Sequence, residues 1–164
     1  MIYFILSFIL DIVLNNSILS CYGNLNYFFP NILVSSIPLV YFLVKNKKFF
    51  FFIIIIFGLL YDFIYSDIFL INTYFFLLFG LFINTFYKSF DFSYFNISII
   101  SILGFLFYDI FIFFILVLLG SYNFDIYDLI YKLIRSFLLN IIYIFISIFI
   151  LSRIFGFRFK KKRY

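Results

Sequence analysis

Apolar runs such as the one from Phe49 to Tyr65 follow one another along almost the whole chain, and only short polar segments separate them. Charged residues make up 12% of the sequence, whereas a soluble domain carries roughly 25%. A helix needs about 20 apolar residues to cross the hydrocarbon core of a bilayer, which is about 30 Å thick. The runs are long and do not alternate with period two, which favours helices over barrel strands. We therefore expect an all-α integral membrane protein.

Six runs are predicted to be transmembrane helices, and the connections between them are short. The segment from Gly120 to Tyr131 mixes polar and aromatic residues, so it is expected to be either an interfacial helix or a simple loop. Residues 1–164 form one transmembrane domain, and residues 153–164 form its basic tail. The predicted spans are 2–21, 28–44, 49–65, 68–87, 95–119 and 133–152.

Basic residues predict the orientation, because they collect in the cytoplasmic flanks of membrane helices. With a cytoplasmic N-terminus and six spans, only Lys132 and Arg135 lie outside. Both termini are therefore predicted to be cytoplasmic, in a multi-pass membrane protein. The basic residues on the cytoplasmic side are Lys45, Lys47, Lys48, Lys88, Arg153, Arg158, Lys160, Lys161, Lys162 and Arg163.

The residue types that are missing limit the chemistry. The chain has no His, Glu, Gln, Ala or Trp, and one Cys. A zinc site of the usual nitrogen and sulfur ligands cannot be assembled, and a Ser-His-Asp or Cys-His arrangement lacks its base. We therefore expect no enzyme, no catalytic residue, no cofactor and no metal. The basic tail is expected to bind membrane lipid rather than nucleic acid.

Three carboxylates interrupt the apolar runs: Asp11, Asp62 and Asp109. Each costs roughly 2.5–3.5 kcal/mol near the middle of a membrane helix, so each is expected to avoid lipid. Lys132 and Arg135 are the basic residues expected to pair with Asp62. Three roles stay open for the aspartates: a structural or partner-facing role, solute, ion or proton handling, and exposure at an interface.

Small and polar residues recur three or four positions apart within the later runs, and such residues share one face of a helix. In membranes these faces pack helix against helix, while the Phe-rich faces meet lipid. The sequence predicts four inward faces: Gly58, Asp62 and Ser66; Thr73, Gly80 and Asn84; Ser98, Ser101 and Gly104; and Lys132, Ser136, Asn140, Tyr143 and Ser147.

Several short motifs follow one another in order along these runs. Each motif consists of residue types that are common in membrane helices. The order and spacing of the motifs therefore carry more information than any single motif. They are Asp11 in the first run, Phe29 to Val34 with Asn31 at the second, Gly58-x-x-x-Asp62 in the third, Asn72 in the fourth and Leu138-x-Asn140 in the last.

With these motifs, six runs and a basic tail, the chain resembles the rod shape-determining protein MreD family over essentially its whole length. The resemblance implies a non-enzymatic scaffold that binds an MreC-like protein and other membrane proteins of the elongation machinery. Such a scaffold organises lateral peptidoglycan synthesis, maintains rod shape and needs no small-molecule substrate. The chain departs from the family at Asp67 and at Leu70-Ile71, where Gly is frequent, and at Ser136, near the place of a frequent Pro.

Two other functions stay open. The first is a solute-binding membrane subunit of a vitamin transporter of the energy-coupling-factor type, whose docking face on the first helix usually carries two Ala residues that this chain lacks. The second is an ion- or proton-coupled carrier that uses Asp11, Asp62 and Asp109. An internal repeat would favour a carrier, but the spacings Gly58-x-x-x-Asp62 and Gly104-x-x-x-x-Asp109 differ.

Overall fold

The residues that the structure describes form six helices. The computed structural model describes residues 2–21, 31–65, 69–89, 93–120 and 125–154, without the side chains of residues 16–21, 88, 89, 135 and 154. The described residues contain helices and turns but no strand, which confirms the all-α prediction. The helices are α1 (Ile2–Cys21), α2 (Ile32–Leu43), α3 (Lys47–Tyr65), α4 (Ile71–Ser89), α5 (Tyr94–Leu118) and α6 (Ile126–Ile154).

Three helices within the described residues are long and apolar enough to cross a membrane. They are Lys47–Tyr65, Tyr94–Leu118 and Ile126–Arg153. The remaining apolar helical stretches are shorter, namely Ile2–Asn15, Ile32–Leu43 and Ile71–Tyr87. To this extent the helices have the character expected of a membrane protein.

The start of α6 differs from the sequence-based expectation. The segment up to Tyr131 was expected to be a separate interfacial helix or a loop, but Ile126 to Tyr131 form the first turns of α6. Asp128 lies in the first turn, where a negative charge stabilises the positive end of the helix dipole. The helix therefore starts before the apolar run that was used to predict it.

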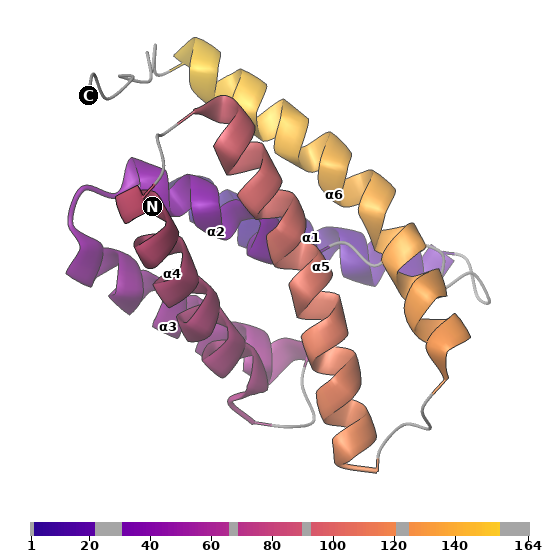
Figure 1. The fold of residues 1–164 in the computed structure, drawn as a ribbon. Coiled ribbons are helices and arrows are strands. Elements are labelled where there is room, and N and C mark those ends of the chain that lie inside the picture. The colour runs from indigo at the N-terminus through magenta and orange to yellow at the C-terminus, as the bar shows by residue number, and fades with distance from the viewer. Residues whose placement is uncertain (1, 22–30, 66–68, 90–92, 121–124, 155–164) are drawn as a thin grey trace.

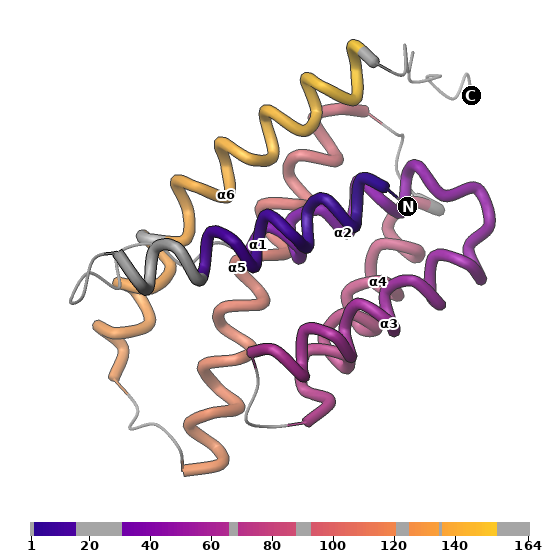
Figure 2. Tube along the Cα trace, turned by 180° about the vertical axis from the view of Figure 1, so that it is seen from behind, coloured from indigo at the N-terminus to yellow at the C-terminus, as the bar shows by residue number. Residues whose placement is uncertain are grey.

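Helix α2 is the centre of the bundle. It contacts all five other helices, and every residue from Ile32 to Tyr41 is buried. In Figure 1, α3 and α4 pack together on one side of α2, and α5 and α6 pack together on the other. Figure 2 shows α1 lying over α2 from behind. Both views place the start of α1 and the end of α6 towards the same end of the molecule.

The distribution of polar and apolar side chains is the reverse of that in a soluble protein. Large apolar side chains such as Phe63 and Leu118 are 73% and 82% exposed, and they cover the outer faces of the helices. Asp11 and Asp109 are 0% exposed. Water would favour the opposite arrangement, because buried charges are costly and large exposed apolar surfaces associate.

Two glycines fit α3 and α4 closely together. A Cβ atom at Gly58 would lie 2.8 Å from the backbone Cα of Thr73. A Cβ atom at Gly80 would lie 2.6 Å from Cδ1 of Ile54, which is the far end of a flexible side chain. The first contact can be relieved only by separating the two helices. The second is relieved by a rotamer change that moves Cδ1 of Ile54, with small shifts of the Phe50 and Phe51 rings, which lie 3.3 Å away.

We therefore expect Gly58→Ala to lower the free energy of unfolding by about 1–3 kcal/mol, the usual cost of overpacking. Gly80→Ala is the matched control on the same helix pair and should cost less. The measurement is reversible unfolding in mixed micelles. Equal losses, or a larger loss at Gly80, would show that backbone contact does not set the tolerance of this interface.

Candidate functional site

The start of α2 lies inside the bundle and is held by side chains from two other helices. The backbone N–H of Ile32 donates a hydrogen bond to Oδ1 of Asp11 in α1, at 3.0 Å. The backbone N–H of Asn31 donates to Oδ1 of Asn140 in α6, also at 3.0 Å. The first N–H groups of a helix have no partner within the helix and carry partial positive charge. Asp11 and Asn140 supply the missing acceptors, and the Asn31 side chain makes no capping bond.

The Asn31 side chain instead reaches α5. Its Nδ2 donates to Oδ1 of Asp109 at 2.9 Å, and the Ser136 hydroxyl of α6 donates to Oδ2 of Asp109 at 2.7 Å. Nζ of Lys132 lies 3.6 Å from Oδ1 of Asp109. Asp109 therefore ties α2, α5 and α6 together with both carboxylate oxygens engaged.

The prediction that Lys132 pairs with Asp62 is wrong, because Lys132 pairs with Asp109. Lys132 lies one helical turn before Ser136 on α6, so its side chain reaches the same carboxylate, Asp109. Asp62 faces α4 instead and takes its donors from the backbone there. The Arg135 side chain, the other expected partner, lies outside the described part of the chain, although its backbone belongs to α6.

Asp62 holds the start of α4. Its Oδ1 accepts from the backbone N–H of Asn72 at 2.8 Å. Its Oδ2 accepts from the backbone N–H of Thr73 at 3.0 Å and from the Thr73 hydroxyl at 2.6 Å. Gly58 lies one turn before Asp62 and makes close approach to Thr73 possible. The spacing Gly58-x-x-x-Asp62 thus has a physical reason: the glycine admits the backbone of α4, and the carboxylate four residues later binds it.

Tyr108 connects the two helix starts. Its hydroxyl donates to Oδ1 of Asn72 at 2.7 Å, and it neighbours Asp109 in α5. It lies within electrostatic range of all three carboxylates. The polar core thus draws on all six helices; we define it as Asp11, Asn31, Asp62, Asn72, Thr73, Tyr108, Asp109, Lys132, Ser136 and Asn140.

Ten residues were the main sequence-based candidates for inward-facing or partner-contacting positions: Asp11, Asn31, Gly58, Asp62, Asn72, Ser101, Gly104, Asp109, Arg135 and Asn140. All except Arg135 have described side-chain positions, and these nine are buried. Six of them belong to the polar core. Gly58 adjoins it, whereas Ser101 and Gly104 pack elsewhere along α5, and Gly104 faces the ring of Phe79. The Ser101 hydroxyl is buried with no hydrogen-bond partner among the described residues. The six core members are Asp11, Asn31, Asp62, Asn72, Asp109 and Asn140.

Sequence reasoning did not single out Tyr108. The chain contains 15 Tyr residues, so a single tyrosine beside an aspartate carries little signal. Tyr3 was missed for the same reason, whereas Tyr143 was expected on the inward face of the last run. The hydroxyls of Tyr3 and Tyr143 lie 2.7 Å apart and join α1 to α6. The Ser7 hydroxyl lies 2.7 Å from that of Tyr143 and completes this second contact.

The arrangement fixes helices against one another. Asp62 and Asp109 use both oxygens on neighbouring helices, and Asp11 uses one; its Oδ2 has no hydrogen-bond partner in the described structure. Over the described residues, no three His, Cys, Asp or Glu side chains gather to hold a metal ion. Comparisons of the chain with protein families, with curated proteins and with solved structures found no match.

Proposed function

We propose that this chain is a non-enzymatic scaffold of the bacterial inner membrane, similar to the MreD family, that organises wall synthesis during elongation. The observation that carries the proposal is a polar core shared by six helices beneath an apolar exterior. Such a bundle keeps a fixed shape and offers its outer faces to lipid and to the helices of partner proteins. The expected partners are an MreC-like protein and the associated wall synthases.

The way the aspartates are used supports a scaffold over a carrier. Asp62 and Asp109 accept hydrogen bonds from helix starts and from side chains of other helices at 2.6 to 3.0 Å. A carrier must release such groups to water or to a solute during each cycle. In this chain, release of Asp62 would free the start of α4, and release of Asp109 would free the Asn31 side chain before α2. These carboxylates are therefore better suited to holding the bundle together.

The proposed topology has six spans and two cytoplasmic termini. It is supported by Lys45 in the α2–α3 connection and by Lys47 and Lys48 at the start of α3, since this connection lies at the end of the molecule where α6 ends (Figures 1 and 2). Arg153 lies in the last turn of α6. Lys132 belongs to the other end of α6 and pairs with Asp109. Helix α2 has 12 residues and rises about 18 Å, which is less than the bilayer core, so the second crossing rests on the sequence.

The test is co-purification from the membranes of the source bacterium. The tagged full-length chain, extracted in mild detergent, is expected to retain an MreC-like protein detected by mass spectrometry. A second multi-pass protein of the same membrane, carrying the same tag and expressed at the same level, is the control and should not retain that partner. Depletion of the chain should produce rounded cells with normal solute uptake.

Other outcomes would contradict the proposal. Rod-shaped cells after depletion, together with no retained MreC-like protein, would remove the scaffold function. A vitamin retained through purification would indicate the solute-binding subunit. A solute or proton flux in vesicles that disappears with Asp62→Asn would indicate a carrier.

A further inference from the structure

An open apolar groove runs between the start of α5 and the end of α6. It has a volume of about 380 Å³ and is lined by Tyr94, Phe145, Ile148, Phe149 and Ser152. This volume lies within the range of about 300–1,000 Å³ that is usual for small-molecule sites. No member of the polar core lines it, so it is a separate feature of the molecule.

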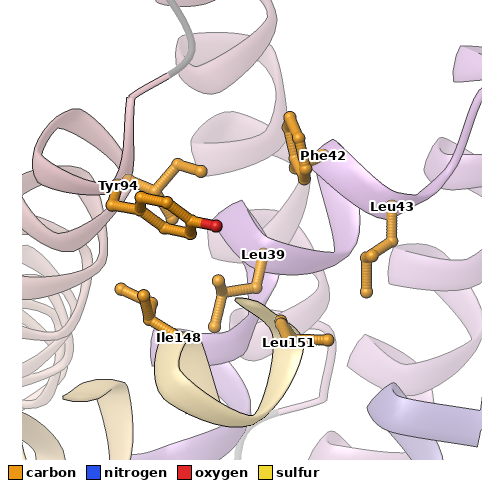
Figure 3. A pocket seen from close by; sticks show the side chains of 7 residues that line it. Leu39, Phe42, Leu43, Tyr94, Ile148 and Leu151 are labelled. Atoms are coloured by element: carbon orange, nitrogen blue, oxygen red, sulfur yellow. The ribbon is translucent and has the colours of Figure 1, made fainter. Parts of the chain in front are cut away.

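The groove borders a narrower recess that reaches α2. Tyr94 and Ile148 line both spaces. Figure 3 shows the recess, where Tyr94 of α5 lies near Leu39 of α2 and near Ile148 and Leu151 of α6. Leu39 and Leu151 are buried. The recess holds only about 10 Å³, close to the volume that one water molecule needs. An occupant of the groove therefore lies along the α5–α6 surface and does not enter the bundle.

A positive charge stands at the rim of the groove. The Arg153 guanidinium carbon lies 5.6 Å from the centre of the Phe149 ring, and the side chain is exposed. By sequence, residues 45–48, 88–94 and 153–164 contain one acidic residue, Asp91, against ten basic ones. The rim therefore suits an anion attached to an apolar chain.

We propose that the groove binds an anionic glycerophospholipid, with one acyl chain against Ile148 and the phosphate at Arg153. A guanidinium binds phosphate oxygens through paired hydrogen bonds. The lining also favours an acyl chain over a partner helix, because helix contacts in membranes are rich in small residues and Ser152 is the only small side chain here. The proposal depends on the membrane location but not on the scaffold function.

The test uses the purified full-length chain in mild detergent and native mass spectrometry. The probes are phosphatidylglycerol and phosphatidylcholine with identical acyl chains. Phosphatidylglycerol should bind more tightly to the unmodified chain. Arg153→Gln should weaken its binding about fivefold, the effect of one basic residue near an anionic headgroup. Ser152→Phe, which fills the groove, should weaken the binding of both lipids.

Two matched variants serve as controls. Lys48→Gln removes an exposed positive charge at the start of α3, and Ile150→Phe adds similar bulk at an exposed position of α6 that does not line the groove. Neither should change lipid binding. Equal binding of the two lipids, or equal losses in Arg153→Gln and Lys48→Gln, would overturn the proposal. So would a Ser152→Phe variant that keeps its lipid but loses a co-purifying membrane protein, since the groove would then belong to a protein helix.

Discussion

Replacing Asp62 with Ala is expected to lower the free energy of unfolding by about 3–5 kcal/mol, the loss typical of removing one partner from a buried charged interaction. The reason lies at the start of α4. Asp62 accepts hydrogen bonds from the N–H groups of Asn72 and Thr73 and from the Thr73 hydroxyl. A buried donor left without an acceptor costs about 1–3 kcal/mol, and three lose theirs together.

Two further variants separate this effect from a general sensitivity to losing a carboxylate. Asp62→Asn keeps one acceptor oxygen, so its free energy of unfolding should lie between those of the unmodified chain and Asp62→Ala. Asp128→Asn removes an exposed carboxylate from the first turn of α6 and should cost less than about 1 kcal/mol. The measurement is reversible unfolding in mixed micelles. Equal losses in Asp62→Ala and Asp128→Asn would show that Asp62 does not hold α4.

Asp109→Ala should cost a similar amount, about 3–5 kcal/mol, but should loosen a different part of the bundle. It leaves the Asn31 amide, the Ser136 hydroxyl and the Lys132 ammonium without the Asp109 carboxylate. The lysine is 29% exposed and can turn towards the headgroups, so its own penalty is reduced. The Asn31 amide is buried and loses the only acceptor that it has in the described structure, whereas the Ser136 hydroxyl keeps a second acceptor, the carbonyl oxygen of Leu133 at 3.2 Å.

Hydrogen–deuterium exchange distinguishes the two aspartate variants. In Asp109→Ala, amides at the start of α2 should exchange faster while those at the start of α4 stay protected. Asp62→Ala should give the reverse pattern. Lys132→Met, added to Asp109→Ala, should recover part of the lost stability because it removes the cation whose carboxylate Asp109 is gone. A uniform rise in exchange along all helices in both variants would contradict these local roles.

The helices and most residues of the polar core, but not Tyr108, could be expected from the sequence, because apolar run length and the cost of a charge in lipid act on each run separately. Which helices and which side chains contact one another could not be expected from the sequence. Lys132 pairs with Asp109 rather than Asp62 because α6 packs beside α5. The composition of six similar apolar runs does not reveal which helices are neighbours. The continuity of α6 from Ile126 was missed because the polar and aromatic residues up to Tyr131 suggested either a separate interfacial helix or a loop.

The start of α2 depends on hydrogen-bond acceptors from α1 and α6, and this dependence determines the order in which the bundle can assemble. A helix start buried in lipid needs partners for its N–H groups, and Asn140, which serves Asn31, is more than 100 positions further along the chain. During synthesis α2 is made long before that partner exists. The middle of the bundle can therefore reach its final form only after the last helix has entered the membrane, and a shortened chain without that helix would contain every residue of α2 but not its completed start.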